Sequence, residues 1–441
     1  MKIKKKCKMK FNKKRKNYRI NCMSLRLCWD DFPEQTDDKA FLDNLLLKPE
    51  EKACNNSDCN KSISDSILSS SVLIKGDNYP VLQLMKDELL GKVNIIYIDP
   101  PYNTGNAFTY KDNFSTSDDR HSAWLSFMNR RLKLAREMLS DDGCIFIAID
   151  QSELYVLKLL CDSIFGEDNF INDFMWLHGK GKKDTWSRTL QQNTLCYAKD
   201  KTKLKSFTEV ESTDWAQTNA DDDPRGNWFS GSVSFTEKRS NPKHKNYYSI
   251  TSPSGIVWTR QWQKSRKEMD RLLAENRIYF GPAPEYNSVP RIKIFNGEQT
   301  EVIPRNIIDC VDSTRKAQRH LDKLLGVKGV FDNPKPVELI SHLIEITQMK
   351  RDAIVMDFFA GSGTTFEAVA KMNAADGGTR QCILVQSGEV VETNNQFRTI
   401  FEICKRRCEI VAEKYNQELE VWELVMKAAP SVECLRSSSE A

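Results

Sequence analysis

The residues best suited to chemistry form the tetrapeptide Asp99-Pro100-Pro101-Tyr102. The Asp99 carboxylate and the Pro100 backbone carbonyl are hydrogen-bond acceptors, and the two prolines hold this corner of the chain rigid. Two acceptors aimed at one amino group localise a nitrogen lone pair that is otherwise delocalised into an aromatic ring. Tyr102 can stack on a base that has left a duplex. The motif predicts attack by an exocyclic amine on an electrophilic carbon; the alternative is a proline turn with a structural aspartate.

A second motif, Asp357 to Thr365, is rich in glycine and small residues. Gly361 and Gly363 allow a tight turn and a close approach of the backbone to a ligand. Thr364 or Thr365 can cap a following helix, whose N-terminus favours a carboxylate or a phosphate. The motif lacks the third glycine of a dinucleotide-binding fingerprint and the Gly-Lys-Ser/Thr of a P-loop. It predicts a ligand site of a different kind from either.

Two polar residues near the end of the next predicted strand are candidates for the same ligand. Glu389 lies 26 residues after Gly363, and a carboxylate there can bind ribose hydroxyls. Gln386 ends the strand itself and is the rival candidate. The sequence leaves the choice between them open.

The elements that must position these motifs alternate between buried strands and amphipathic helices. Continuous apolar runs predict strands, and apolar residues at helical spacing predict helices. The expected strands are 93–98, 144–149, 353–360 and 381–386, and the expected helices are 120–139, 151–165, 336–349 and 396–414. This alternation is typical of a doubly wound, mostly parallel α/β sheet, in which ligands bind at the carboxyl ends of the strands.

Composition limits the class of protein. The 441 residues are 40% hydrophobic and 29% charged, which suits a packed core and indicates two or three domains. No apolar run approaches the roughly 18 residues of a membrane span, and no apolar segment follows the basic start as in a secretory signal. The 13 cysteines include no C-x-x-C pair, which favours a reducing cytosol, and the five dispersed histidines predict no metal site.

Charge is unevenly distributed along the chain. The first twenty residues hold eleven Lys/Arg and no acid, and residues 176–320 hold 25 Lys/Arg against 17 Asp/Glu. Turns and short strand-like pieces within 179–320 predict an irregular α+β insertion. A basic insertion fits contact with a polyanion, and a solvated surface is the alternative. Its tryptophans can stack on bases or form ordinary core.

The chain is therefore expected to divide into five segments. They are a basic, flexible N-terminal region and linker (1–70), a catalytic half (71–178), an inserted recognition domain (179–320), a cofactor-binding half (331–415) and a C-terminal tail (416–441). The sequence leaves open whether residues 1–22 precede a true start at Met23.

The two motifs together resemble those of the β group of amino-methylating DNA methyltransferases, in which the catalytic motif precedes the cofactor motif. The chain is most similar to the modification (Mod) subunits of type III restriction-modification systems. The matching segments are Lys75 to Asn78, Asp99 to Asn106, Phe108, Tyr110, Asp112 to Phe114, Trp124 to Met128, Leu139 to Gly143, Tyr279 to Gly281, Asn287 to Arg291, Phe331 to Pro336, Asp357 to Thr365, Gly377–Gly378 and Ile383 to Gln386. Two segments depart from the family pattern. Relatives usually show His-Glu-Tyr where Gln191 to Lys199 keeps only the final Tyr-Ala-Lys, and Leu-Pro-Glu where this chain has Ser387-Gly388-Glu389.

The resemblance implies a circularly permuted Rossmann-like core, S-adenosylmethionine as cofactor without a metal, and N6 of adenine in double-stranded DNA as acceptor. It assigns catalysis to Asp99, Pro100, Pro101 and Tyr102. It assigns cofactor binding to Lys335, Asp357, Phe359, Gly361, Gly363 and Thr364, with Gln386 or Glu389 in addition. A homodimer and a restriction (helicase-nuclease) subunit are candidate partners, and the bacterial cytoplasm is the expected location.

The residues expected to contact DNA are basic and lie in the insertion. They are Arg260, Lys264, Arg266, Lys267 and Arg291. A solvated helix face is the alternative for the cluster 260–267. For the activity, the alternatives are methylation of N4 of cytosine, of an RNA adenine or of a protein glutamine. A catalytically silent DNA-binding or subunit-partner module is a further alternative.

Overall fold

The computed structural model describes residues 27–50, 62–106, 109, 112–114, 120–178, 186–212, 218–391 and 396–427. The chain separates into two compact units. Met1–Phe207 with Arg305–Ala441 form the first unit, here named the core, and Thr208–Pro304 form the second, here named the insert. The insert is narrower than the expected 179–320. The basic start of the chain, Phe108 and Tyr110 lie outside the described residues.

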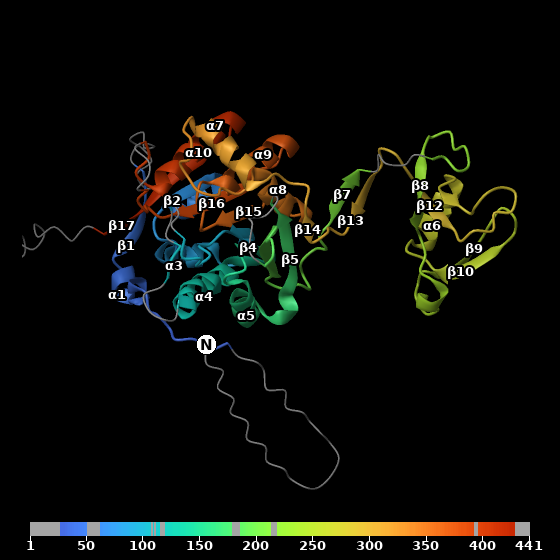
Figure 1. The fold of residues 1–441 in the computed structure, drawn as a ribbon. Coiled ribbons are helices and arrows are strands. Elements are labelled where there is room, and N and C mark those ends of the chain that lie inside the picture. Colours follow the sequence, from blue (N-terminus) through green and yellow to red (C-terminus); the bar gives the residue numbers. More distant parts are fainter. Residues whose placement is uncertain are drawn as a thin grey trace, which may run out of the picture. The chain divides into compact units, whose positions relative to one another are not determined.

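The described part of the core is built on one ten-stranded sheet with the order β1-β17-β2-β16-β15-β3-β4-β6-β5-β14 (Figure 1). The strands are β1 (Leu45–Pro49), β2 (Ser71–Lys75), β3 (Val93–Ile98), β4 (Leu139–Ile149), β5 (Phe170–Leu177), β6 (Gln191–Ala198), β14 (Ile307–Ile308), β15 (Ile354–Asp357), β16 (Gln381–Gln386) and β17 (Leu419–Met426). Pairing is parallel from β17 across to β4, whereas β1 and β6 join the sheet antiparallel. The expected doubly wound α/β class is confirmed.

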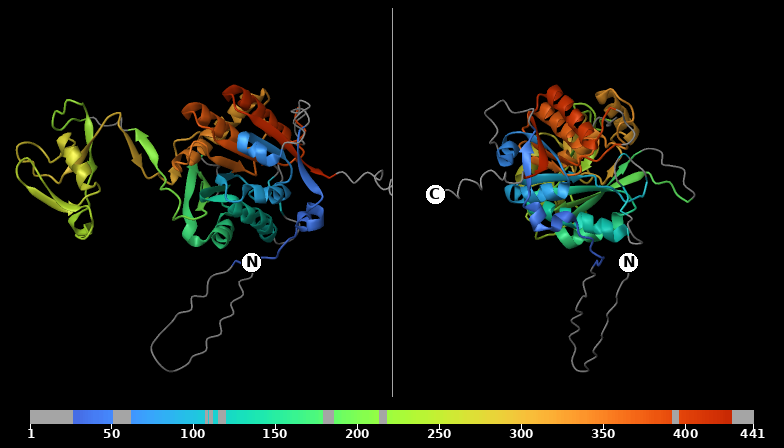
Figure 2. Two further views of the ribbon diagram at one scale, coloured as in Figure 1. Left: turned by 180° about the vertical axis from the view of Figure 1, so that it is seen from behind. Right: turned by 90° about the vertical axis from the view of Figure 1, so that its left-hand side faces the viewer.

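Helices cover both faces of this sheet (Figures 1 and 2). One face carries α3 (Asn78–Leu89), α4 (Arg120–Met138) and α5 (Leu154–Phe165), and the other carries α8 (Val337–Ile346), α9 (Thr364–Asp376) and α10 (Ile400–Tyr415). The remaining helices are α1 (Lys39–Leu42), α2 (Ile63–Ser69) and α7 (Thr314–Leu325), with short 3-10 turns η1 (Gln35–Asp37) and η3 (Glu167–Asn169). Among the described residues, no helix has both the length and the apolar character needed to cross a bilayer.

Strand β3 shows why the apolar run 93–98 forms a buried strand. Ile96 and Ile98 pack in the hydrophobic cluster that contains α3, α4 and α5. Ile95 and Tyr97 point to the opposite face and pack in the cluster that contains α8, α9 and α10. Side chains alternate between the two faces of a strand, so a strand covered on both faces must be apolar at nearly every position.

The sheet brings the two motifs together although 258 residues separate Asp99 from Asp357. Strand β15 pairs with β3 in parallel, with Val355 opposite Ile95 and Met356 opposite Ile96. Parallel neighbours end at the same edge of a sheet. The catalytic motif after β3 and the glycine-rich motif after β15 therefore lie side by side.

The structure corrects the expectation of flexible terminal segments. Within the expected N-terminal region, Leu45–Pro49 forms β1, and within the expected tail, Leu419–Met426 forms β17. The two strands pair with each other, and β17 continues the sheet beside β2. Neither segment was predicted as a strand, and the partner of each lies almost the whole chain away.

Two further expectations need correction. The strand expected at 144–149 begins earlier, because β4 starts at Leu139 and includes the exposed Asp141 and Asp142 at a shift in the register with β3. Residues 186–207 belong to the core, because β6 lies between β4 and β5 in the central sheet. Helix α7 also belongs to the core and not to the insert.

The insert is a small α+β unit with its own hydrophobic cluster. Its elements are β7 (Glu209–Ser212), β8 (Trp228–Ser232), η4 (Glu237–Arg239), β9 (Tyr247–Thr251), β10 (Val257–Gln261), α6 (Arg266–Ala274), β11 (Ile278–Tyr279), β12 (Arg291–Phe295) and β13 (Gln299–Val302). Trp262 is fully buried in this cluster and Trp228 is also buried, so these two tryptophans are core residues and not exposed stacking platforms.

Candidate active site

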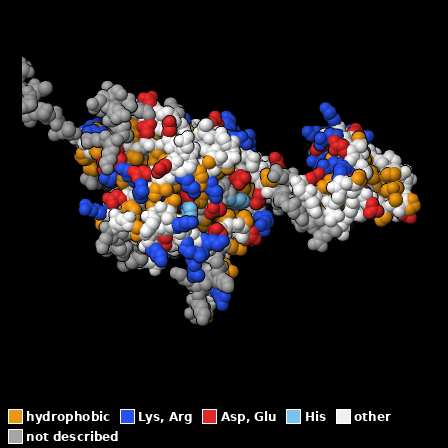
Figure 3. All heavy atoms as spheres, turned by 90° about the horizontal axis from the view of Figure 1, so that it is seen from above, with side chains coloured by type: hydrophobic (Ala, Val, Ile, Leu, Met, Phe, Trp, Pro, Cys, Tyr) orange, Lys and Arg blue, Asp and Glu red, His pale blue; other side chains and the backbone are white. Residues whose placement is uncertain are grey.

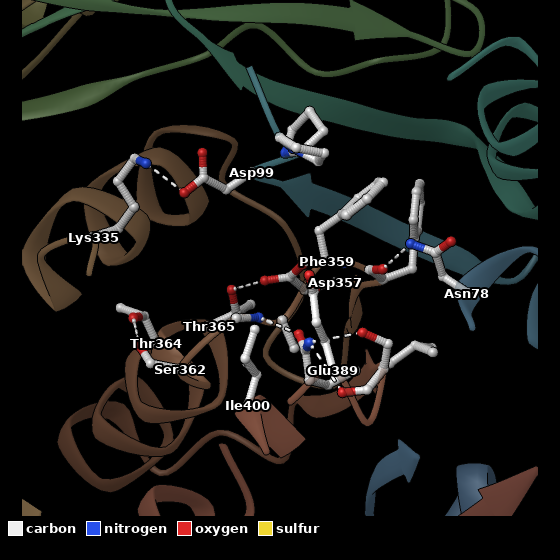
Figure 4. A pocket seen from close by; sticks show the side chains of 18 of the residues that line it. Asn78, Asp99, Lys335, Asp357, Phe359, Ser362, Thr364, Thr365, Glu389 and Ile400 are labelled. Atoms are coloured by element: carbon white, nitrogen blue, oxygen red, sulfur yellow. Dashed lines mark hydrogen bonds and ion pairs between the residues drawn. The ribbon is translucent and has the colours of Figure 1, made fainter. Parts of the chain in front are cut away.

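Residues of both motifs line one cavity of about 640 Å³ at the carboxyl ends of the central strands (Figure 4), although Tyr102 is not among the lining residues. Asp99, Pro100 and Pro101 come from the end of β3, and residues 357–362 with Thr364 come from the end of β15. Cavities of roughly 300–1,000 Å³ are typical of small-molecule sites. The site therefore has room for a nucleoside-sized ligand and for part of a second one.

The catalytic corner is held by a network of side chains. Lys335 donates to Asp99 Oδ2 in an ion pair (Figure 4), and the Tyr102 hydroxyl lies 2.5 Å from Asp99 Oδ1. The Lys335 ammonium also lies 3.0 Å from the Tyr102 oxygen. The Trp124 indole donates to the Pro101 carbonyl at 2.8 Å. The corner is thus fixed from α4 on one side and from the segment before α8 on the other.

Lys335 was expected among the cofactor-binding residues, and the structure places it at the catalytic corner. It lines the cavity and it pairs with Asp99, so one side chain connects the expected catalytic and cofactor sets. The side chain is 9% exposed. A cation at this position neutralises the charge of the Asp99 carboxylate while leaving further lone pairs of its oxygens able to accept hydrogen bonds.

The loop that follows the catalytic corner is anchored by buried polar groups. Asp112 accepts hydrogen bonds from the backbone N–H groups of Asn103 at 2.9 Å and Thr104 at 3.0 Å. The Asn103 amide donates to Glu153 Oε1 at 2.7 Å, and His121 contacts the same oxygen at 2.7 Å. Burial raises the pKa of Glu153, although its hydrogen bonds to His121 and Asn103 oppose the shift. These contacts hold Asn103 in its left-handed conformation with φ of 59°.

The glycine-rich turn after β15 needs its glycines for two different reasons. Gly361 (φ 54°) donates its N–H to Gln386 Oε1 at 2.7 Å and lines the cavity. Gly363 (φ 81°) does not line it; a Cβ there would lie 3.0 Å from Cys408 Sγ and 3.2 Å from Cys404 Sγ. Gly363 thus packs closely against α10, and its expected contact with the cofactor stays a prediction.

The threonines of this turn do not cap α9 with their side chains. Gly363 occupies the N-cap position without a side-chain hydrogen bond. The Thr365 hydroxyl donates to Asp357 Oδ2 at 2.5 Å, and the Thr364 hydroxyl accepts from Arg407 at 2.8 Å. The expected capping role is wrong, because both hydroxyl groups are directed at ionic side chains. Thr364 still lines the cavity.

Asp357 is a buried carboxyl group at the bottom of the cavity. Burial raises its pKa to about 7, although the Thr365 hydroxyl and the Phe359 N–H, 3.0 Å from Oδ1, oppose the shift. The negative charge of Asp99 raises the pKa further and the positive charge of Lys335 lowers it. Phe359 itself lines the cavity, and its ring packs at a tilt against the ring of Phe127.

A buried ion pair supports the glycine-rich turn from beneath. Arg407 of α10 donates to Glu367 of α9 at 2.8 Å, and its other nitrogen donates to the Ser362 hydroxyl at 3.0 Å. His320 contacts the second oxygen of Glu367 at 2.6 Å. Burial alone would raise the pKa of Glu367, but the hydrogen bond from His320 and the charge of Arg407 outweigh it and lower the pKa to about 2.

Gln386 and Glu389, the two candidates at and after the end of β16, both line the cavity. Gln386 is buried, and its amide oxygen already accepts from the Gly361 N–H, so it shapes the turn. Glu389 is half-buried, and its backbone carbonyl accepts from the Ile400 N–H at 2.9 Å. Both residues therefore stay candidates for a ligand contact, and Gln386 in addition shapes the glycine-rich turn.

The basic residues expected to contact DNA are differently placed within the insert. Lys264 pairs with Glu268 at 3.0 Å and Arg266 with Asp270 at 2.9 Å, one turn apart on or next to α6. Arg260 pairs with Glu237 at 3.3 Å. Lys267 is exposed, and Arg291 is exposed while donating to Ser230. The sequence showed the positive charges but not the acids that fold next to them.

Several residues of the site were missed by reasoning from sequence. Asn78 lines the cavity and donates to the Phe358 carbonyl at 2.7 Å, while the buried Arg131 donates to Asn78 at 2.5 Å. Gln192 of β6 donates to the Tyr102 hydroxyl at 2.6 Å. The Asp77-Asn78 pair was noticed only as a family match. The segment around Gln192 was noticed only as a departure from the family pattern, and Gln192 itself was given no role.

Comparison with known proteins agrees with this geometry. The model of the DNA methylase family (N6_N4_Mtase) matches residues 93–413, which include both motifs and the insert. The chain belongs to the DNA methylase family. This confirms the resemblance drawn from the two motifs.

Three relatives show the range of proteins that resemble the chain. It is 33% identical to the Mod subunit of the type III restriction-modification enzyme StyLTI of Salmonella typhimurium, over 80% of this chain and 58% of that one. It is 34% identical to the Mod subunit of the type III enzyme EcoPI of Escherichia phage P1, over 85% of this chain and 66% of that one. It is also 32% identical to the type II methyltransferase M.KpnI of Klebsiella pneumoniae, over 80% of this chain and 91% of that one. The chain thus spans only about three fifths to two thirds of the two Mod subunits.

Proposed function

We propose that this chain transfers a methyl group from S-adenosylmethionine to N6 of adenine in double-stranded DNA. The observation that carries the proposal is the meeting of the Asp-Pro-Pro-Tyr corner and the glycine-rich turn in one cavity, on strands β3 and β15 that pair directly. An acceptor corner and a cofactor turn must lie this close if an amine is to attack a cofactor carbon in a single step.

The charges that line the cavity fit S-adenosylmethionine. Among the described residues, five acids face it against the single cation Lys335; they are Asp77, Asp99, Asp332, Asp357 and Glu389. A net negative lining favours a cofactor that carries a positive sulfonium. The buried Tyr97 hydroxyl also lines the cavity and has no hydrogen-bond partner among the described residues, so a bound polar group can satisfy it. The cofactor supplies an electrophilic methyl group, and the chain itself supplies only binding and orientation.

We assign the following roles to the residues of the chain. Asp99 and the Pro100 carbonyl accept hydrogen bonds from the target amino group and localise its lone pair, and Tyr102 stacks on the base. Asp357, Phe359 and Glu389 hold the cofactor, with Gly361 allowing its approach. Lys335 keeps Asp99 in place and balances its charge. Because the amine is brought to one fixed position, orientation accounts for much of the rate.

Double-stranded DNA is the proposed partner of the insert. The relatives named as type III Mod subunits are components of a two-subunit class of enzyme, so a restriction subunit is a further proposed partner for this chain. M.KpnI, of which the chain covers 91%, is a type II methyltransferase, which makes independent action the alternative. Size-exclusion chromatography of the chain purified from its own cells separates these: elution with a second, larger polypeptide supports the partner, and elution alone contradicts it.

The activity is tested by incubating the purified chain with unmethylated duplex DNA and tritiated S-adenosylmethionine. Mass spectrometry of the nucleosides is expected to show N6-methyladenine. N4-methylcytosine in its place would contradict the choice of base, and no transfer to any DNA or RNA would contradict the activity. Single-molecule sequencing of DNA from cells that express the chain then gives the position of the modified base, from which defined substrates can be made.

A further inference from the structure

Three side chains from three separate elements converge on the Tyr102 hydroxyl. It lies 2.5 Å from Asp99 Oδ1, 2.6 Å from the amide nitrogen of Gln192 and 3.0 Å from the Lys335 ammonium. Asp99 and Tyr102 follow β3, Lys335 precedes α8, and Gln192 lies in β6. The sequence distance between Gln192 and Tyr102 is 90 residues.

The chemistry of these groups fixes the direction of the hydrogen bonds. An amide NH2 and an ammonium group can only donate, so the Tyr102 oxygen accepts from Gln192 and from Lys335. Its own proton is therefore directed at Asp99, which can only accept when ionised. The Gln192 contact thus determines where the phenolic proton points, and so which oxygen of the catalytic corner receives it.

Strand β6 gives the Gln192 amide a rigid base. Gln192 stands opposite the buried Trp176 of β5, and its neighbour Asn193 stands opposite Ile149 of β4. Residues 193–198 are all buried in the sheet. The amide oxygen of Gln192 has no hydrogen-bond partner among the described residues, so no competing contact draws the side chain away from Tyr102.

The Tyr102 ring is consequently fixed at both ends. Its backbone follows the Pro101 corner, whose carbonyl accepts from Trp124, and its hydroxyl is held by Gln192 and Lys335. A ring fixed at both ends presents one face in a constant direction, as stacking on a target base requires. Without the Gln192 bond, Lys335 holds the hydroxyl at a longer distance and must divide its donors between Tyr102 and Asp99.

We propose that Gln192 is a positioning residue of the methyl-transfer site. It acts through the Tyr102 hydroxyl to hold the ring in the orientation that receives the target base. The inference rests on the proposed function, because it assigns Tyr102 to that base. It adds a residue from β6, a strand that neither motif contains and that the expected domain boundaries placed in the insertion.

The test is a double-mutant cycle of Gln192→Leu and Tyr102→Phe, with Gln191→Leu as the matched control. Gln191 is the neighbouring residue of β6, has the same side chain, is also half-buried and has no side-chain hydrogen bond within the described part of the chain. Each variant is assayed on a defined duplex for kcat and KM. A second duplex carries the fluorescent base 2-aminopurine at the target position, and calorimetry gives the affinity for S-adenosylmethionine.

Gln192→Leu is expected to lower kcat/KM about three- to tenfold, the value of one neutral hydrogen bond, and to reduce the 2-aminopurine signal of the flipped base. Cofactor affinity is expected to stay the same. In the Tyr102→Phe background, Gln192→Leu is expected to cause no further loss, because the hydroxyl through which it acts is already gone. Gln191→Leu is expected to match the wild type.

Other outcomes overturn the inference in distinguishable ways. If the losses of the two variants multiply in the double variant, Gln192 does not act through Tyr102. If Gln191→Leu causes the same loss as Gln192→Leu, the effect belongs to the strand and not to the hydrogen bond. A wild-type chain that methylates no nucleic acid contradicts the proposed function and the inference together, whereas an active wild type with multiplying losses contradicts the inference alone.

Discussion

The core and the insert use charge in opposite ways. In the core, five described acidic residues and Lys335 surround one cavity, and their positions are set by the ends of neighbouring strands. In the insert, residues 208–304 hold thirteen Lys/Arg and thirteen Asp/Glu, and many of these pair on the surface. The basic excess of 176–320 therefore lies in flanking segments that belong largely to the core. An excess of acidic residues identifies the cavity in the core. The net charge of the insert is balanced and so does not identify a surface for nucleic acid.

One segment of the insert escapes this balance. Residues 238–245, here named the basic loop, contain Lys238, Arg239, Lys243 and Lys245 and no acid. All four are exposed, and none has an ion pair with another described residue. Figure 3 shows Lys and Arg side chains gathered on one side of the insert. Cations without acidic partners are the ones available to DNA phosphates.

The largest effect is expected in the core, from Asp99→Ala. Loss of one preorganised acceptor at the reacting group typically lowers kcat by about 10²–10³-fold. Cofactor affinity is expected to fall much less than kcat, because Asp99 is only one of the five described acids that line the cavity. Single-turnover methyl transfer with saturating substrates measures the effect, and near-normal turnover would remove Asp99 from the role assigned to it.

The next largest effect is expected on DNA binding by the insert. It compares the unpaired cations of the basic loop with the paired cations on and next to α6. Changing all four cations of the basic loop to Gln should weaken DNA binding and reduce the slope of log K against log salt by about 0.9 for each phosphate that the variant no longer neutralises. The control changes Lys264, Arg266, Lys267 and Arg271 to Gln, which removes the same charge. Three of these four pair with acids one turn away, so the control should weaken binding less. Equal weakening in fluorescence-anisotropy titrations would show that ion pairing does not decide DNA contact here.

The pH dependence of cofactor binding tests the charge of the core cavity. Because the pKa of Asp357 is about 7, its carboxyl group is protonated in acid and ionised above that pH. The ionised form attracts a cation, so affinity for S-adenosylmethionine should rise between about pH 6 and 8, roughly tenfold for each unit by which the bound cation lowers the pKa.

Asp357→Asn is the control for this pH dependence. It keeps the shape of the side chain and should remove most of the rise, while the titration of the cofactor itself is common to both proteins. Calorimetric titrations at both pH values measure the difference. The same rise in both proteins would show that Asp357 does not titrate in this range.

The smallest effect is expected on stability, when alanine replaces each of two glycines that have a similar positive φ. Gly363 in the core has φ of 81° and close sulfur neighbours, whereas Gly255 in the insert has φ of 88° and nothing within 4 Å of an added Cβ. Both alanine variants should lose about 1 kcal/mol of unfolding free energy from strain, and Gly363→Ala should lose roughly 1 more from crowding. Urea unfolding measures both, and equal losses would show that α10 yields to the added methyl group.

The fold of the core followed from sequence because its central elements carry their own signal. The apolar run at 93–98 and the helix with Trp124 and Leu132 need no distant partner to be recognised. Strands β1 and β17 were not predicted, since β1 pairs with β17, and β17 pairs with β1 and β2, across almost the whole length of the chain. Strand β6 was misplaced because its apolar half, 194–198, is preceded by polar residues that resemble a loop.

The site was predictable to the extent that its motifs are continuous in sequence. Residues of both motifs line the cavity, but the threonine hydroxyls do not cap α9, and Gly363 packs against the sulfur atoms of α10. Lys335, Gln192 and Arg407 owe their roles to contacts with elements that are distant in the sequence. No pattern of spacing encodes such contacts, which depend on strand order and packing.

The pairing of β3 with β15 has a consequence for synthesis of the chain. When the ribosome has completed β3 and β4, one edge of β3 still lacks its neighbour, and about 205 further residues must be made before β15 begins. Open apolar strand edges are templates for unwanted association, and closing them late is slow because the loop is long. The open edge of β3 in the incomplete chain is therefore the surface on which a chaperone is expected to act during synthesis.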